Sequence, residues 1–92
     1  MIDFKNIGYF FYPKTILFFT SISKEDNILP LISKKCNVTY SYCFKIMKKL
    51  EEEGLIKLEE KDKRTNFIIL TEIGKKVQDL LLKINELIKK RG

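Results

Sequence analysis

Residues 40–70, YSYCFKIMKKLEEEGLIKLEEKDKRTNFIIL, contain the change of periodicity that decides the fold. In the first half of this stretch, apolar side chains recur at helical spacing, three, four and seven positions after Cys43. We therefore expect a helix over residues 40–53, ended by Gly54, with one apolar face directed to a core. That face consists of Cys43, Ile46, Met47 and Leu50.

The second half of the stretch has the pattern of a β-hairpin. Residues 55–59 and 67–70 are short runs rich in apolar side chains, and the polar segment 61–65 separates them. Runs of this length, joined by a short polar segment, are typical of paired antiparallel strands. The sequence thus predicts two strands whose connecting tip is basic.

Upstream, residues 9–19 are the most apolar part of the chain, interrupted by Pro13 and Lys14. The uninterrupted apolar length is well below the ~20 residues that a helix needs to span a bilayer. Because proline fits the first turn of a helix, we expect a helix from Pro13 to about Ser23. Its expected core face contains Ile16 and Phe19, with Phe18 and Ile22 as further candidates. The aromatic residues before Pro13 are interpreted as an arm that packs on a partner subunit.

A short helix is expected next, over residues 28–35. Asn27 is its predicted N-cap, and Pro30 is tolerated because it falls in the first turn. Asn37 follows the helix, and asparagine is the non-glycine residue that best tolerates a left-handed conformation. The sequence therefore predicts a tight turn at Asn37, after which Thr39 caps the helix of residues 40–53.

Thr71 and Glu72 open a last helix, in which apolar residues recur at spacings of three and four. This apolar face is wider than one short domain needs, so we expect it to pair with a second copy of the chain. The predicted dimer interface contains Ile73, Val77, Leu80, Leu81, Ile84, Leu87 and Ile88. Residues 1–72 would then form the domain with its aromatic arm, and residues 73–92 its dimerisation helix.

Composition restricts the classes of function. With 92 residues, 45% of them hydrophobic and 33% charged, the chain is expected to form one small domain, which excludes large multi-step enzymes. It lacks histidine, and two cysteines alone cannot complete a four-ligand zinc site. We therefore expect no catalytic residue, no metal and no cofactor. Cys36 and Cys43, with no signal-peptide pattern before them, indicate a cytoplasmic protein in which both are small structural hydrophobes.

The formal net charge of +6 is distributed unevenly. Residues 31–50 contain five lysines and no acidic residue, whereas residues 51–60 contain five glutamates and one lysine. A segment with basic charges alone suggests a face that meets phosphate, and a solvated helix face is the alternative interpretation. Glu51, Glu52 and Glu53 are expected to pair with neighbouring lysines on the surface.

The order helix, helix, turn, helix, hairpin, helix resembles winged helix-turn-helix DNA-binding domains. Residues 31–39, LISKKCNVT, are similar to the first motif helix and its turn, with Asn37 where these domains usually carry glycine. Residues 48–56, KKLEEEGLI, resemble the end of the recognition helix. DKRT at 62–65 and ILTEIG at 69–74 are similar to the wing and the following helix of MarR-type transcription regulators.

This resemblance covers residues 17–77 and implies an α+β, mainly α, winged helix-turn-helix fold. Three helices form its core, a two-stranded hairpin forms its wing, and a long C-terminal helix mediates dimerisation. Full-length MarR-type proteins are longer, with further dimerisation helices and an effector pocket between them. The chain looks more like the compact winged-helix regulators of archaea and their viruses, so a small-molecule effector is not expected.

The helix of residues 40–53 is expected to enter the major groove by its N-terminal half. Tyr40, Ser41 and Lys45 carry groups that reach base edges or phosphates. Tyr42 lies at the margin, where it either contacts DNA or packs against the hairpin or the first helix. Phe44 falls on the outward face, where its ring either touches a thymine methyl group or is partly buried, and burial is the favoured interpretation. The predicted contacts of this helix are Thr39, Tyr40, Ser41, Tyr42, Lys45, Lys48 and Lys49, and those of the preceding helix with the DNA backbone are Lys34 and Lys35.

The hairpin tip supplies the second predicted contact. Arg64 is expected to enter the minor groove, whose narrow A·T-rich form attracts a guanidinium group strongly. Lys61, Lys63 and Thr65 complete the predicted wing contacts, and Asp62 is expected to hold Arg64 in place without touching DNA. The alternative interpretation is an exposed turn with solvated charges.

These features predict a homodimeric transcription regulator that binds double-stranded DNA and has no membrane partner. Two alternatives stand beside it. The first is an architectural, chromatin-like protein that binds DNA with little sequence preference, since phosphate contacts carry no sequence information. The second is a winged helix used as a protein-interaction module, because fold alone does not dictate function.

Overall fold

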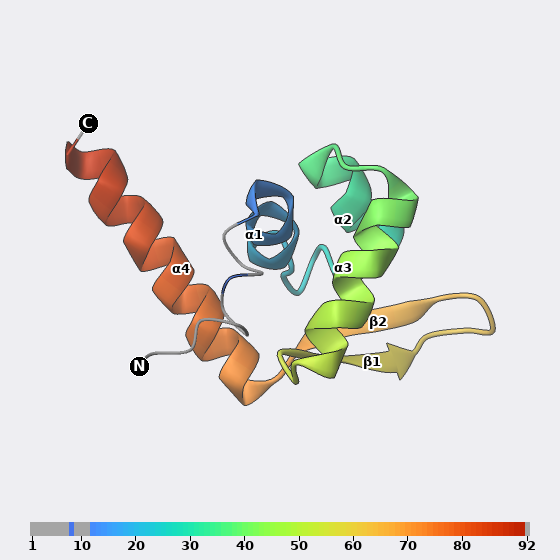
Figure 1. The fold of residues 1–92 in the computed structure, drawn as a ribbon. Coiled ribbons are helices and arrows are strands. Elements are labelled where there is room, and N and C mark those ends of the chain that lie inside the picture. Colours follow the sequence, from blue (N-terminus) through green and yellow to red (C-terminus); the bar gives the residue numbers. More distant parts are fainter. Residues whose placement is uncertain (1–7, 9–11, 92) are drawn as a thin grey trace.

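The computed structural model describes residues 8 and 12–91, in which a helical core carries a hairpin on one side and a long helix on another (Figure 1). The helices are α1 (Pro13–Thr20), α2 (Leu29–Cys36), α3 (Tyr40–Glu52) and α4 (Glu72–Arg91). The strands β1 (Ile56–Glu60) and β2 (Asn66–Leu70) pair antiparallel, with Ile56 opposite Leu70 and Glu60 opposite Asn66. This order confirms the predicted α+β, mainly α, winged helix-turn-helix fold.

The core lies among α1, α2 and α3, and the hairpin closes it. The largest fully buried side chains are Phe18 and Phe19 of α1, Ile32 of α2, Leu50 of α3, Ile56 of β1 and Ile68 of β2. Burying an apolar side chain of this size stabilises the fold by about 1.5–3 kcal/mol relative to exposing it. The predicted apolar face of α3 is confirmed, because all four of its members belong to this cluster.

α1 is shorter than predicted, since it ends at Thr20 and not near Ser23. The hydroxyls of Thr20 and Ser21 each donate a 2.7 Å hydrogen bond to a carbonyl oxygen one turn earlier, and such bonds compete with continued helical pairing. Phe18, Phe19 and Ile22 are buried as predicted, but Ile16 is only partly buried, and Thr15 lies in the interior. Residues 9–11 of the predicted aromatic arm lie outside the described residues.

α2 begins one residue later than predicted, at Leu29, with Ile28 and not Asn27 in the N-cap position. The main chain of Asn27 has a different role, because its carbonyl oxygen accepts a 2.7 Å hydrogen bond from the N–H of Ile68. This bond ties the start of α2 to β2. At the other end of α2, Asn37 adopts the predicted left-handed conformation, with φ 53° and ψ 46°.

The turn between α2 and α3 is fixed by two hydrogen bonds. The Ser33 hydroxyl donates to the carbonyl oxygen of Val38 at 2.7 Å, and the N–H of Val38 donates to the carbonyl oxygen of Ser33 at 3.3 Å. Thr39 occupies the predicted N-cap position of α3, but its side chain makes no capping hydrogen bond. The two Ser33–Val38 bonds, and not a cap by the Thr39 hydroxyl, therefore hold the turn from which α3 starts.

Thr71 joins the hairpin to α4. Its Oγ1 accepts a 3.0 Å hydrogen bond from the N–H of Gly74, as an N-cap residue does, and donates a 2.7 Å bond to the carbonyl oxygen of Gly54. Its own N–H donates to the carbonyl oxygen of Leu55 at 3.1 Å. The end of α3, the base of the hairpin and the first turn of α4 are thus linked at one residue.

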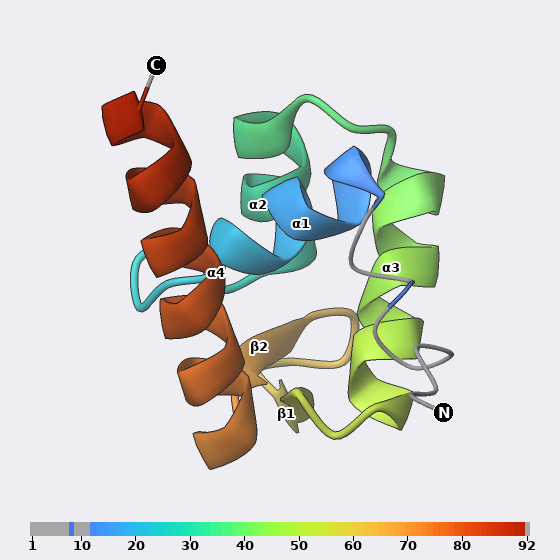
Figure 2. The same cartoon turned by 60° about the vertical axis from the view of Figure 1, so that its left-hand side comes forward.

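α4 starts beside the hairpin, passes α1 and continues away from α3 (Figures 1 and 2). Val77 and Leu81 pack against the core, so these two members of the predicted dimer interface already have intramolecular contacts. The other five members are exposed: Ile73, Leu80, Ile84, Leu87 and Ile88. Within the described residues, no helix is both long and apolar enough to cross a membrane.

Candidate nucleic-acid interface

The N-terminal half of α3 presents its predicted polar residues at the surface. Tyr40 has 56% of its area exposed, and Ser41 and Lys45 are exposed as well. They lie on the side of α3 opposite the buried face because they alternate with its core residues at helical spacing. Thr39, one residue earlier, is exposed too. These side chains offer hydroxyl and ammonium groups that can donate to, or accept from, base edges and phosphates.

Tyr42 lies at the margin of this surface, toward α1. The ammonium nitrogen of Lys14 sits 4.9 Å from the centroid of the Tyr42 ring, a distance at which a cation and an aromatic face attract each other. Tyr42 also lines a hollow of about 330 Å³ together with Tyr12, Thr15 and Lys45. Of the two interpretations of Tyr42, packing toward the first helix matches this arrangement.

Burial, the favoured of the two interpretations of Phe44, is wrong, because its side chain is 47% exposed. Phe44 follows Tyr40 by one helical turn and precedes Lys48 by another, so it belongs to an exposed row of α3. The neighbouring core positions are already filled by Cys43 and Met47, which are buried. The spacing of Phe44 from Tyr40 already indicated an exposed position, and burial was expected only because phenylalanine is hydrophobic.

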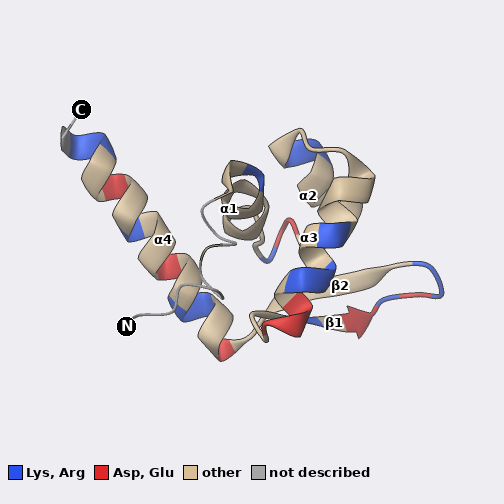
Figure 3. Ribbon diagram, in the orientation of Figure 1, with Lys and Arg blue, Asp and Glu red and all other residues tan. Residues whose placement is uncertain are grey.

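Figure 3 marks the basic and acidic residues on the ribbon, and the predicted cations among them differ in their partners. Lys48 pairs with Glu51 at 3.6 Å, and Lys49 with Glu52 and Glu53 at 3.9 and 3.8 Å, as expected for surface pairs one turn apart. Lys35 forms a shorter pair, 2.8 Å from Asp26. Exposed pairs of this kind contribute about 0–1 kcal/mol, so the lysines can exchange them for phosphate at small cost. Lys34 and Lys45 are exposed.

The wing tip is closed by Asp62. One of its carboxylate oxygens, Oδ1, accepts hydrogen bonds from the N–H groups of Arg64 and Thr65, both at 2.9 Å. The carbonyl oxygen of Thr65 accepts in turn from the N–H of Lys61 at 3.0 Å. Asp62 thus positions Arg64 through the main chain and not by pairing with its guanidinium. The side chains of Lys61, Lys63 and Arg64 are exposed around this turn.

These bonds have a measurable consequence for the pKa of Asp62. The N–H of Arg64, with a smaller contribution from Thr65, favours the ionised carboxylate and holds the pKa of Asp62 below its ordinary value of 3.8. Because the pKa of Asp62 is lower in the folded chain than in the unfolded one, the ionised carboxylate stabilises the tip at every pH above the unfolded pKa. This stabilisation is lost as the pH falls through the folded pKa. The closed tip should therefore persist throughout the neutral range.

We expect the amide chemical shifts of Arg64 and Thr65, followed by NMR, to change together with a midpoint below pH 3.8. The reason is that both N–H groups lose their acceptor when Asp62 is protonated. In Asp62→Asn, the matched control, this transition should vanish while the rest of the spectrum is retained. A midpoint at or above 3.8 in the unmodified chain would contradict the arrangement.

A hollow of about 100 Å³ brings α3 and the wing together. Tyr40 and Phe44 line it from α3, and Arg64, Thr65 and Asn66 line it from the hairpin. Leu29 and Pro30, at the start of α2, complete the wall together with Met47. Among the residues that the structure describes, no carboxylate belongs to this lining. The predicted recognition helix and the predicted wing therefore share one continuous surface, to which Pro30 and Asn66 add residues that the sequence patterns did not indicate.

The two cysteines are free thiols in the interior of this half of the molecule. Burial raises the pKa of the Cys43 thiol, an effect that a hydrogen bond with Ser33 partly offsets. A buried thiol of raised pKa carries little thiolate, which agrees with the predicted structural role. Among residues 8 and 12–91, no group of three or more Cys, Asp and Glu side chains is arranged to hold a metal ion.

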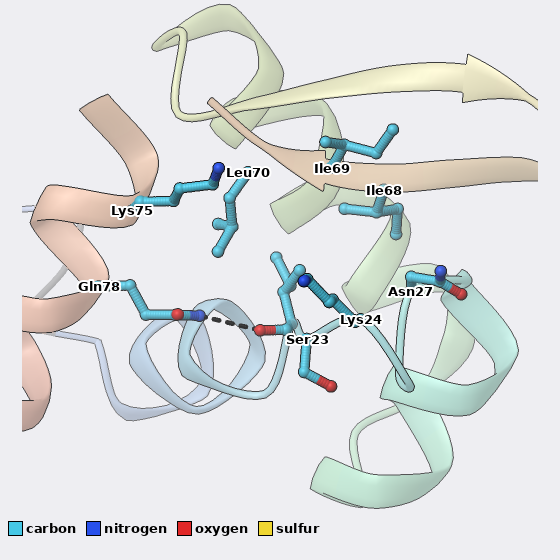
Figure 4. A pocket seen from close by; sticks show the side chains of 9 residues that line it. Ser23, Lys24, Asn27, Ile68, Ile69, Leu70, Lys75 and Gln78 are labelled. Atoms are coloured by element: carbon cyan, nitrogen blue, oxygen red, sulfur yellow. Dashed lines mark hydrogen bonds between the residues drawn. The ribbon is translucent and has the colours of Figure 1, made fainter. Parts of the chain in front are cut away.

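A second hollow, of about 430 Å³, lies between α4, β2 and the α1–α2 connection (Figure 4). Gln78 of α4 points across it and donates hydrogen bonds to the carbonyl oxygens of Phe19 and Ile22, at 2.9 and 3.0 Å. Lys24 and Lys75 stand at its edge. The two Gln78 hydrogen bonds across this hollow hold α4 to the end of α1.

A model of the winged helix DNA-binding domain family matches residues 15–74. This segment contains α1, α2, α3, the hairpin and the first residues of α4, and it amounts to more than half of the chain. The chain therefore belongs to the winged-helix DNA-binding domain family. No curated protein sequence matches it.

Solved structures with this fold include AF1382, from an archaeon, and a bacterial MarR protein. AF1382 from Archaeoglobus fulgidus has a TM-score of 0.78 at 28% identity, over 91% of this chain and 97% of that one. MarR from Staphylococcus aureus, solved with salicylate and kanamycin, has a TM-score of 0.72 at 26% identity, over 91% of this chain and 59% of its own. The chain is thus a MarR-like winged-helix domain.

FabT from Streptococcus pneumoniae, solved in complex with DNA, shares the fold with a TM-score of 0.72 at 22% identity. The alignment covers 86% of this chain and 57% of FabT. The chain therefore spans less than two thirds of the length of both FabT and S. aureus MarR.

Proposed function

We propose that the chain is a sequence-specific transcription regulator that binds double-stranded DNA. The N-terminal half of α3 enters the major groove, and Arg64 at the wing tip enters the adjacent minor groove. One observation carries this proposal: Tyr40 of α3 and Arg64 of the wing line one hollow, to which no carboxylate of the described residues contributes. The solved complex of FabT with DNA supports the partner, because the two chains share the fold.

The charges of the described residues support the same orientation. Lys45 and Ser41 are exposed near the start of α3, and Glu51–Glu53 lie at its other end, where they pair with lysines of the same helix. A recognition helix that enters the groove by its N-terminal half keeps those carboxylates away from the phosphates. Lys34 and Lys35 at the end of α2 would contact the DNA backbone beside the groove.

The proposal is tested by selecting bound duplexes from a random library and then titrating the selected duplex and a scrambled one across salt. A sequence-specific regulator should prefer its selected duplex by about 1,000-fold or more, because base contacts add to the phosphate contacts. Near-equal affinity for both duplexes would instead identify an architectural protein. Absence of binding at low salt would rule out DNA as the partner and leave the protein-interaction alternative.

The proposed active form is a homodimer in which α4 packs against α4 of a second copy. Leu80, Leu87 and Ile88 support it, because 58%, 66% and 67% of their respective areas are exposed on one helix. Two recognition helices placed by such a dimer would read half-sites about 34 Å apart, one turn of DNA. The interface would use the exposed part of the predicted stripe, with Val77 and Leu81 supporting α4 from within each subunit.

Replacing Leu80 and Leu87 with aspartate should convert this dimer to a monomer at micromolar concentration, measured by sedimentation. Burying four carboxylates between two helices is costly, whereas each exposed leucine can change without loss of the core. Glu86→Lys, on another side of α4, is the control and should remain dimeric. The unmodified chain running as a monomer at the same concentration would defeat the dimer.

A further inference from the structure

The exposed phenyl ring of Phe44 has no role in the core. Its helical neighbours Cys43 and Met47 are buried, and Phe44 is 47% exposed. An aromatic ring loses favourable burial when it faces water, so the fold gains little from phenylalanine at this position. The ring instead lines the hollow that α3 shares with the wing, next to Tyr40 and Arg64.

The surroundings of this ring are cationic. Lys45 follows it directly, Lys48 lies one turn further along α3, and Arg64 is across the hollow. An apolar group inside a basic surface matches a partner that is polyanionic but carries an apolar group of its own. Duplex DNA meets this description, because the C5-methyl of thymine is the apolar group that its major groove displays.

A phenyl ring has no hydrogen-bond donor or acceptor, so it cannot read the amino, carbonyl or ring-nitrogen groups of the base edges. It can read a methyl group by contact. We infer that Phe44 is a specificity-determining residue that recognises thymine through its C5-methyl in the major groove. This inference rests on the proposed function. It specifies one base that the recognition helix reads, thymine, and the group on that base that is contacted, the C5-methyl.

The test replaces each thymine of the selected duplex, one at a time, by deoxyuridine, which lacks only the methyl group. At one position in each half-site, the unmodified protein should bind about four-fold more weakly, since one buried methyl is lost. Phe44→Ala should bind the thymine duplex about 16-fold more weakly, because the proposed dimer then loses this contact in both half-sites. In that variant the same deoxyuridine substitution should have no further effect, because the two changes remove one contact.

Leu17→Ala is the matched control, because Leu17 is also an apolar helix residue that is 47% exposed, but on α1. It should bind both duplexes as the unmodified chain does. The inference is overturned if deoxyuridine weakens binding to neither protein, or weakens binding to the unmodified protein and to Phe44→Ala equally. It is also overturned if Phe44→Ala binds the selected duplex normally, a result that would assign the ring to a protein partner.

Failure of this inference and failure of the proposed function give different results. If the unmodified protein enriches no duplex, the proposed function fails and the inference fails with it. If it enriches a duplex and discriminates against the scrambled one, but thymine methyl groups make no difference, only the inference fails.

Discussion

Gly74→Ala is expected to destabilise the fold by about 3 kcal/mol or more, the upper range for forcing a methyl group into a packed site. A Cβ at residue 74 would overlap the carbonyl oxygen of Leu55 and lie 2.9 Å from its carbonyl carbon. These atoms cannot move aside freely, because the same carbonyl accepts the N–H of Thr71. Urea denaturation of both proteins measures the difference.

Whether Gly74→Ala lowers or raises the free energy of unfolding shows whether packing or helix propensity dominates at this position. In an exposed helix, alanine is more favourable than glycine by about 1 kcal/mol, so propensity alone predicts that the substitution stabilises. Gly54→Ala is the informative comparison, because nothing lies near its Cβ and only its φ of +76° opposes a side chain. That variant should lose about 1–2 kcal/mol. A smaller loss for Gly74→Ala than for Gly54→Ala would contradict the close approach of α4 to the hairpin.

The double substitution Lys45→Glu and Arg64→Glu is expected to weaken binding to the selected duplex by about 1,000-fold for each half-site, with each reversed contact costing about 2 kcal/mol. Lys45 belongs to the major-groove contact of α3 and Arg64 to the minor-groove contact of the wing. Both side chains are exposed, so the melting temperature should change little. Fluorescence anisotropy at fixed salt measures the affinity.

Lys24→Glu combined with Lys75→Glu is the matched control, because it changes the net charge by the same amount at the edge of the hollow between α4 and β2. This control should reduce affinity only slightly, through the general field of the protein. The salt dependence should become shallower in the first double variant, since fewer counterions are released. Equal losses in the two double variants would show that net charge, and not the proposed surface, determines binding.

Much of the fold could be predicted because local signals agreed with one another. Asn37, Gly54 and Thr71 each occupy a position that their backbone preferences suit, and the apolar spacing of α3 matches its buried face. Asn27 was misassigned because its main chain is engaged by Ile68, about forty positions away, and no local pattern contains that bond.

The sequence was enough to predict which residues belong to the candidate site, but not how all of their side chains are oriented. Arg64 was placed at the wing tip by its motif, yet the two N–H groups that Asp62 holds depend on the geometry of the turn. Phe44 was misassigned for a physical reason: hydrophobicity measures what a side chain gains from burial, and helical spacing determines whether burial is available. The structure resolves that conflict in favour of spacing.

The two hydrogen bonds from Gln78 to the end of α1, together with the links at Thr71, make the direction of α4 a fixed property of each subunit. In the proposed dimer, the distance and the relative orientation of the two recognition helices would then be fixed. Each base pair inserted between two half-sites rotates one against the other by about 35°. Such a rigid dimer would tolerate little variation in the spacing between half-sites. Its targets would therefore be selected by the rotational position of the two half-sites on the DNA as well as by their sequence.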